Sequence, residues 1–166
     1  MWIATPYFVP DEQFLSALKI AALRGCDVRI IVPDSNDNQL VHFATWALID
    51  RLKGTGVQFY RYEAAFMHQK VMLIDDHIAT VGTANFDNRS FRLNFEINIA
   101  VDDEEFAGKV AAMLESDLSH SRAVGPEELD NSQLLAAIGY AQCAPDRAHT
   151  LEFVLGASLL SVVGLE

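Results

Sequence analysis

A histidine and a lysine separated by one residue give this sequence its clearest chemical signal. Alternate side chains of an extended chain share a face, so His68 and Lys70 are expected to point the same way on a strand. An imidazole exchanges protons or attacks as a nucleophile near neutral pH, whereas an ammonium is a fixed positive charge. Together they suit a phosphate, because the imidazole attacks phosphorus or protonates a leaving oxygen while the ammonium stabilises the oxyanion.

Polar residues further along the chain complete the predicted site. Thr83 and Asn85 follow the next predicted strand, where neutral donors would extend an anion cradle. Glu96 lies on the polar face of a later strand, and its carboxylate could hold the imidazole in one tautomer. Asp75 has the opposite parity to His68 and sits at a turn, so we expect it away from the phosphate, where it ties a hairpin down.

The hydrophobic pattern predicts the elements that position these residues. Strand-like runs alternate with helical spacing in the first part of the chain, and a hairpin, an alternating strand and an acidic helix follow. We therefore predict one α/β domain whose mixed, mostly parallel β-sheet has helices on both faces. The expected elements are strands at Trp2–Val9 (interrupted by Pro6), Val28–Val32 and Val57–Tyr62, helices from Asp11 to Gly25 and from Leu40 to Gly54, a hairpin of Met67–Ile74 and His77–Val81 joined by the turn Asp75-Asp76, a strand at Phe95–Val101, and helices that open at Asp102–Glu105 and at Pro126.

Composition limits the class of protein. The 166 residues are 51% hydrophobic, which predicts a folded core. Lys and Arg total 12 against 23 Asp and Glu, a net charge of −11, so no nucleic-acid partner is expected. Cys26 and Cys143 lie in no metal-like spacing, and we predict no metal and no cofactor. The apolar run Phe153–Val163 is too short to cross a bilayer, and packing against the protein is favoured over a membrane-surface anchor.

The spacing HxK-x4-D-x6-G-[ST]-x-N, from His68 to Asn85, resembles the HKD signature of the phospholipase D superfamily. The stretches TPYFVPDE (5–12), AALRGCDVRIIVP (21–33) and GTANFDNRSFRLNFEIN (82–98) are similar to the carboxy-terminal half of bacterial cardiolipin synthases. We therefore expect residues 1–122 to form a phospholipase D-like catalytic half-domain with one HKD motif. Residues 123–166 are expected to be a helical or apolar extension.

The resemblance implies a phosphatidyltransferase that uses neither metal nor cofactor. It would transfer a phosphatidyl group from one phosphatidylglycerol to another through a phosphohistidine intermediate, with release of glycerol. The resemblance assigns His68 as the catalytic histidine, Lys70 and Asn85 as phosphate-binding residues assisted by Thr83, Glu96 as the residue that orients His68, and Asp75 as the structural third letter of the motif. Arg89 is expected either to contact a phosphate or to form a local salt bridge.

One departure from the family keeps the function open. The family builds each active site from two HKD motifs, whereas this sequence has one. Either the chain is a piece of a two-motif enzyme, or two copies pair around a twofold axis. The alternatives to the phosphatidyltransferase are a homodimeric single-motif phosphodiesterase or nuclease, and an inactive half that only packs against a partner. The resemblance also implies association with the bacterial inner membrane, through a partner, a further segment or Phe153–Val163.

Overall fold

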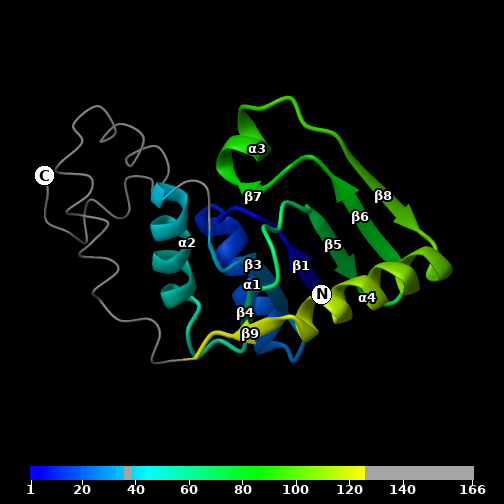
Figure 1. Cartoon of the computed structure of the whole chain (residues 1–166), viewed down its shortest axis with the longest axis horizontal. Helices are drawn as coiled ribbons and strands as arrows, with labels where there is room; N and C mark the ends of the chain where they lie inside the picture. Colours follow the sequence, from blue (N-terminus) through cyan, green and yellow to red (C-terminus); the bar gives the residue numbers. More distant parts are fainter. Residues whose placement is uncertain (36–38, 126–166) are drawn as a thin grey trace, which may run out of the picture.

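The structure, a computed structural model, describes residues 1–35 and 39–125. Within them, helices pack on a large central sheet, and a two-stranded sheet lies beside it (Figure 1). The elements are β1 (Trp2–Ala4), β2 (Phe8–Val9), α1 (Glu12–Leu23), β3 (Arg29–Pro33), α2 (Gln39–Arg51), β4 (Gln58–Tyr62), β5 (Val71–Ile74), β6 (Ile78–Gly82), β7 (Phe86–Asp87), α3 (Asn88–Arg92), β8 (Asn98–Asp102), α4 (Glu104–Ser119) and β9 (Ser121–Ala123).

The large sheet has seven strands in the order β8-β6-β5-β1-β3-β4-β9. The predicted α/β class, with a mixed sheet and helices on both faces, is confirmed, but the expectation of mostly parallel pairing is wrong. Among the described strands of this sheet, only the pairs β1–β3 and β3–β4 are parallel, because α1 and α2 carry the chain back between them. The pairs β1–β5, β5–β6, β6–β8 and β4–β9 are antiparallel.

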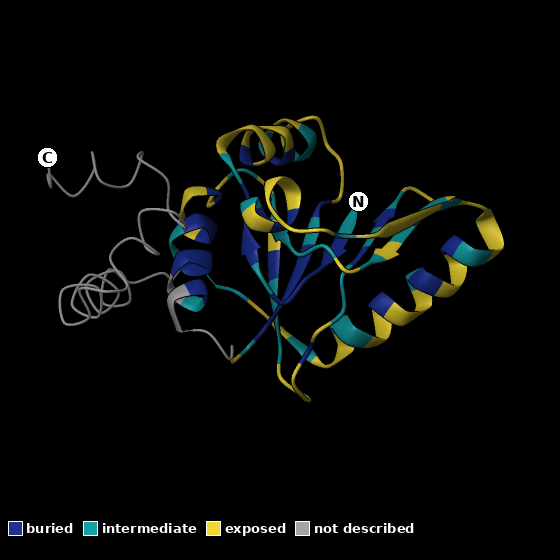
Figure 2. Cartoon of the chain, turned by 90° about the horizontal axis from the view of Figure 1, so that it is seen from above, coloured by how far each residue is buried: buried dark blue, intermediate teal, exposed yellow. Residues whose placement is uncertain are grey.

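Helices cover the two faces of the sheet unequally. On one face, α1 and α2 contribute Leu15, Leu18 and Ile49 to a core with Ile30 and other buried strand residues. On the other face, α4 is the one described helix that packs over a second buried cluster. This helix begins after β8 and ends beside β9, so it crosses the sheet from one edge to the other, with its buried side chains toward the strands (Figures 1 and 2).

Helices α1 and α4 begin at the predicted capping residues, and α1 ends just before the predicted glycine. The Asp11 side chain accepts hydrogen bonds from the backbone N–H groups of Gln13 and Phe14, which confirms it as the N-cap of α1. Gly25 follows α1 with φ at 90°, a conformation that favours glycine. Asp103 caps α4 through the N–H of Phe106 and lies within the acidic run predicted to open that helix.

Several predicted strands are shorter than expected. The run Trp2–Val9 is divided between β1 and β2, and β2 pairs with β7 in the second sheet because the chain changes direction around Pro6. The hairpin begins at Val71 and not at Met67, and its turn is Asp75–His77, with Asp75 at a φ of 53°. The predicted strand Phe95–Val101 is observed as the shorter β8, Asn98–Asp102, so residues 95–97 lie before it. Helix α3 and strand β7 were not predicted.

The carboxy-terminal expectations lie outside the described residues. These are the helix from Pro126, the apolar run Phe153–Val163 and almost all of the extension 123–166. Residues 121–123 form β9 and pair with β4, so the sheet continues to the boundary predicted at residue 122. In residues 1–35 and 39–125, no helix has the length and apolar character needed to cross a bilayer.

Candidate active site

His68 and Lys70 lie side by side at the start of the hairpin. The ammonium nitrogen of Lys70 is 3.2 Å from Nδ1 and 3.3 Å from Nε2 of the His68 ring, and it donates a 2.8 Å hydrogen bond to the His68 carbonyl oxygen. Both residues precede β5, so the predicted strand position is wrong although the predicted proximity is correct. An imidazole and a positive charge therefore occupy one small area where an anion can meet both groups.

The surroundings of His68 leave its ring accessible. The residue is exposed, and the ring of Phe66 stacks on it at a centroid distance of 5.9 Å and an interplanar angle of 20°. Met67, the preceding residue, is 5% exposed and packs in the cluster under α4. The Gln69 side chain donates a hydrogen bond to the Asp117 carboxylate on α4. The segment thus presents His68 and Lys70 on one side and is anchored by Met67 and Gln69 on the other.

Gly82 allows two parts of the site to approach closely. A Cβ at this position would lie 1.8 Å from Oδ1 of Asn98, 2.4 Å from the carbonyl oxygen of Ile97 and 2.7 Å from Cα of Asn98. Because two of these neighbours are backbone atoms, a larger residue cannot be accommodated by rotating a side chain. The absence of a side chain therefore brings the turn after β6 against the segment that leads into β8.

Thr83 connects this turn to Glu96. Its hydroxyl donates a 2.6 Å hydrogen bond to Oε2 of Glu96 and accepts a 2.9 Å bond from the N–H of Ile97. Oε1 of Glu96 accepts a 3.0 Å bond from the amide of Asn94. The hydrogen bond from Thr83, followed by that from Asn94, lowers the pKa of Glu96, and the charge of Lys70 acts in the same direction. Within the described chain, the Glu96 carboxylate bonds these neighbours and not the His68 ring.

Asn85 is held by a small network that the sequence analysis did not identify. Its N–H donates a 3.0 Å bond to the hydroxyl of Ser90, which is 5% exposed. The N–H of Ser90 donates a 2.7 Å bond to Asp87, the N-cap of α3. Oδ1 of Asn85 is buried and has no hydrogen-bond partner among the described residues. The spacing of Asp87 and Ser90 is that of a helix cap and is the signal that could have predicted α3.

A small hollow lies between these parts. It has a volume of about 80 Å³, and its wall includes Lys70, Ala84, Phe91 and Asn98. It places the lysine beside the turn after β6 and the start of β8. The structure thus brings Lys70 beside Gly82 and Ala84, whereas the described residues that line this hollow do not include His68, Thr83 or Asn85.

Two predicted site residues lie apart from this group. Asp75 is exposed in the hairpin turn, at the opposite end of β5 from Lys70, and its side chain makes no hydrogen bond to the described residues. Its predicted separation from the phosphate-binding groups is consistent with this position, but no contact shows it tying the hairpin down. Arg89 is exposed on α3, and its side chain makes no salt bridge within the described residues.

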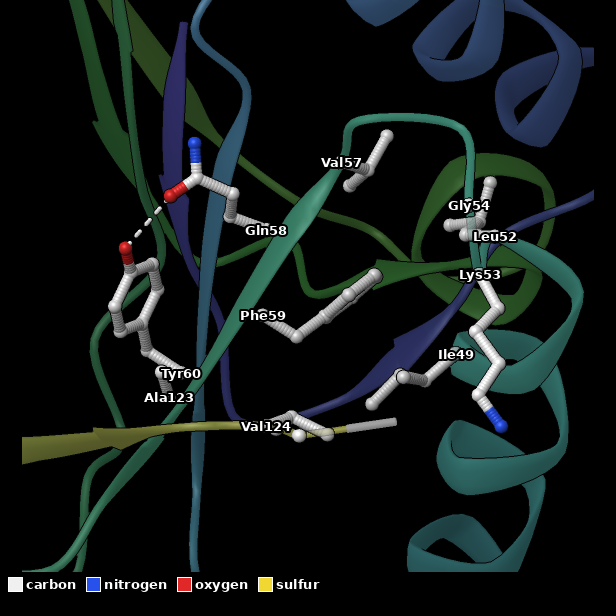
Figure 3. Close-up of a pocket in the computed structure, with 11 residues that line it drawn as sticks. Ile49, Leu52, Lys53, Gly54, Val57, Gln58, Phe59, Tyr60, Ala123 and Val124 are labelled. Atoms are coloured by element: carbon white, nitrogen blue, oxygen red, sulfur yellow. Dashed lines mark hydrogen bonds between the residues drawn. The ribbon is translucent and has the colours of Figure 1, made fainter. Parts of the chain in front are cut away.

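A larger hollow lies toward the β9 end of the sheet and has different chemistry. It has a volume of about 240 Å³ and lies between α2, β4 and β9 (Figure 3). Ile49, Leu52, Phe59 and Val124 supply much of its wall, and Lys53 is the charged residue that lines it. Among the described residues, no imidazole, thiol or carboxylate lines it. Volume alone therefore does not identify the candidate site of this chain.

Comparisons with known proteins agree with the motif. The sequence family described as cardiolipin synthase, PLD-like domain, matches residues 1–118. Cardiolipin synthase A from Pseudomonas aeruginosa (strain PAO1) is 46% identical over 139 residues, and that from Pseudomonas putida (strain W619) is 42% identical over the same length. These alignments include 84% of this chain but only 28% and 29% of the relatives, so the chain spans less than a third of their length.

Solved structures share the fold. The phosphatidylserine synthase of Haemophilus influenzae Rd KW20 aligns with a TM-score of 0.68 at 18% identity, over 90% of this chain and 41% of that one. The phospholipase D family member Nuc from Salmonella typhimurium aligns with a TM-score of 0.64 at 19% identity, over 74% and 79% of the two chains. NucT from Helicobacter pylori aligns with a TM-score of 0.59 at 29% identity, over 74% and 80%.

Proposed function

The chain belongs to the phospholipase D-like domain family of cardiolipin synthases, and from this premise we propose that it is one catalytic half of a phosphatidyltransferase. The whole enzyme transfers a phosphatidyl group from one phosphatidylglycerol to another and releases glycerol. The observation that carries the proposal is the Lys70 ammonium within 3.3 Å of both ring nitrogens of the exposed His68.

The proposed reaction has two displacements at phosphorus. A ring nitrogen of His68 attacks the donor phosphodiester, a P–N bond forms, and the P–O bond to the glycerol head group breaks. A second histidine, from the other half of the enzyme, gives the departing glycerol its proton. A hydroxyl of the second phosphatidylglycerol then transfers its proton to that histidine, attacks phosphorus and breaks the P–N bond. His68 is regenerated, and no metal or cofactor takes part.

The remaining residues have supporting roles in this proposal. Lys70 neutralises charge on the non-bridging oxygens, and Asn85 binds the same phosphate through its amide. Thr83 fixes the position of Glu96, since it donates directly to that carboxylate. Glu96 orients His68 once a lipid phosphate and the second half complete the site. Two residues lie outside this group: Asp75 is the structural member of the motif, and Arg89, exposed on α3, is proposed to contact a lipid phosphate.

An uncovered apolar surface supports the need for a second half. Leu93, Phe95, Ile97 and Ile99 alternate along the segment leading into β8 and are between 59% and 107% exposed. Val81, which pairs with Ile99, is 42% exposed. We call these five residues the apolar stripe. β8 is also an edge strand of the described sheet, and a large exposed apolar surface on an edge marks an interaction site. A second HKD half, in the same polypeptide or in a second copy, is the proposed partner.

Labelled phosphatidylglycerol tests this function in membranes that contain the full gene product. Unsubstituted protein is expected to form labelled cardiolipin, and His68→Ala is expected to lose activity by about 10⁴-fold or more. His77→Ala is the matched control, because His77 is exposed in the hairpin turn and is expected to retain activity. Equal cardiolipin formation in His68→Ala and His77→Ala would remove His68 from the mechanism.

A homodimeric phosphodiesterase or nuclease is the second candidate. The single motif favours it, and so does the fold shared with Nuc, because the alignment includes most of both chains, 74% of this one and 79% of Nuc. The net charge of −11 disfavours a nucleic-acid substrate. Metal-independent, salt-sensitive cleavage of plasmid DNA by the pure protein, lost in His68→Ala, would support this alternative over lipid transfer.

The proposed location is the bacterial inner membrane, where the lipid substrate resides. Membrane contact is proposed to come from a partner, from a further segment or from the apolar run Phe153–Val163. Fractionation of cells expressing the full gene product tests it. We expect the protein in the membrane fraction, and recovery of active enzyme from the soluble fraction alone would contradict this location.

A further inference from the structure

We propose that Gln69 and Asp117 are positioning residues that fix the HxK segment (His68–Lys70) against α4, an inference that rests on the proposed function. Gln69 lies between the two functional residues, and its side chain points to the opposite side. Its Nε2 donates a part-buried hydrogen bond to Oδ2 of Asp117, 48 residues further along the chain. The middle residue of the motif is thereby connected to the helix on the far face of the sheet.

The backbone gives the HxK segment little support of its own. Residues 64–69 lie outside every helix and strand and make no backbone–backbone hydrogen bond within the described chain. The flanking backbone bonds are from the Glu63 N–H to the His120 carbonyl and from the Gly82 N–H to the Lys70 carbonyl, both 3.1 Å. Between these two points, buried Met67 supplies apolar packing and Gln69 supplies a directional contact.

Asp117 is well placed to hold Gln69 and poorly placed to stabilise its own helix. A carboxylate near the carboxyl end of a helix interacts unfavourably with the partial negative charge there. The carbonyl oxygen of Asp117 accepts bonds from the N–H of His120 (3.1 Å) and the hydroxyl of Ser121 (2.7 Å), which fixes the backbone where α4 turns into β9. An ionised acceptor on this fixed backbone makes a stronger hydrogen bond to Gln69 than a neutral one would.

The consequence for catalysis is geometric. An error of about 1 Å in the position of a reacting group reduces a rate by about 100-fold. Binding of a lipid through its whole surface is less sensitive to such an error. Loss of the Gln69–Asp117 bond is therefore expected to lower kcat and to leave KM nearly unchanged.

Substitutions that keep the shape of the side chains provide the test, with labelled phosphatidylglycerol and the full gene product. Gln69→Glu opposes two carboxylates and is expected to lower kcat by about 10- to 100-fold, with KM changed by less than about threefold. Adding Asp117→Asn restores a bond in which the amide donates to Glu, and kcat is expected to recover to within about threefold of the unsubstituted enzyme. Gln13→Glu and Glu115→Gln make the same chemical changes at exposed positions and serve as controls.

Each outcome decides the proposal. A Gln69→Glu enzyme with unchanged kcat, or a drop that Asp117→Asn does not reverse, overturns the positioning role. A lowered unfolding temperature with unchanged kcat also overturns it, because the bond would then serve stability alone. If Gln69→Glu does not fold, the double variant decides, since folding without activity contradicts the proposal and recovered activity supports it. Failure of the unsubstituted enzyme to form cardiolipin would instead contradict the proposed function.

Discussion

Two extended segments line the candidate site, and they differ in what lies behind them. In Met67–Val71 the side chains that point away from the site are buried or half-buried against the α4 side of the sheet. In Leu93–Ile99 the polar side chains of Asn94 and Glu96 point toward the site, where Glu96 bonds Thr83 and Asn94. The apolar residues that alternate with them are strongly exposed. The same alternation thus has an internal support in one segment and an open surface in the other.

The path of α4 accounts for this difference. The helix begins at the β8 edge of the sheet and ends beside β9 at the other edge, so it contributes Val110 and Leu114 to the cluster that contains Met67 and Val71. It leaves the apolar stripe uncovered. The chain thus packs Met67 beneath its own histidine and lysine, whereas the apolar side of the segment with Glu96 is exposed and is the surface proposed for a partner.

The strongest test of the comparison is at Gly82, where the β6 turn meets the second segment. Gly82→Ala is expected to destabilise the protein by about 3 kcal/mol or more, because the new Cβ would overlap backbone atoms of Ile97 and Asn98. Chemical denaturation measures the effect. Gly108→Ala is the matched control: apart from its chain neighbours and the backbone of α4 itself, nothing lies within 4 Å of the new Cβ, and it is expected to stabilise by about 0.5 to 1 kcal/mol. Equal stability of the two variants would contradict the close approach at Gly82.

Truncation of Met67, which is buried beneath the segment Met67–Val71, is expected to have the next largest effect on stability. Met67→Ala should cost about 2 to 3 kcal/mol of unfolding free energy, because a buried side chain leaves a cavity under the HxK segment. Phe95→Ala behind the second segment should change stability by less than about 0.5 kcal/mol, because Phe95 is fully exposed. Urea denaturation of both variants measures the contrast. Similar losses would show that the two segments are supported alike.

The apolar stripe should matter for assembly more than for folding. Phe95→Ser with Ile97→Ser is expected to weaken association with a second HKD half by about 2 kcal/mol, or about 30-fold in Kd, because exposed aromatic anchors dominate interfaces. Sedimentation or light scattering at several concentrations measures it. Ile20→Ser, which changes an exposed residue of α1, is the control. Unchanged association in the double variant would place the partner elsewhere.

The smallest expected effect is a pH dependence from Glu96. Its folded-state pKa lies below the ordinary 4.5, chiefly because Thr83 donates a hydrogen bond to it. The resulting stability is present above pH 4.5 and is lost as pH falls through the lowered pKa. Thr83→Val should therefore reduce stability at pH 7 more than at pH 3. Thr83→Ser keeps the hydroxyl that donates to Glu96, so it should show no such pH-dependent loss. Urea midpoints at both pH values measure this, and a loss that is the same at pH 7 and pH 3 would contradict the link to Glu96.

Local patterns predicted much of the fold. The N-cap at Asp11, the helix ends and the adjacency of His68 and Lys70 all follow from residues close together in sequence. The strand boundaries were less predictable, because β5 begins at Val71 only where a neighbouring strand is available to pair. α3 was missed because its cap, Asp87, lies within an apolar and polar mixture without clear periodicity.

The hydrogen bonds of Glu96 could not be predicted from the sequence. Its parity correctly placed it on the polar side of its segment, but the hydrogen bond to Thr83 depends on how the β6 turn meets the start of β8. The role in orienting His68 therefore remains a prediction.

The sequence alone determined the family of this protein and the proximity of His68 and Lys70, because motif spacing and hydrophobic periodicity act over a few residues and can be recognised without knowledge of the fold. Only the tertiary structure decided which side of each segment is supported. The Gln69–Asp117 bond and the uncovered stripe both depend on the path of α4 across the sheet. That path is set by packing between residues far apart in the chain, and no local pattern encodes it.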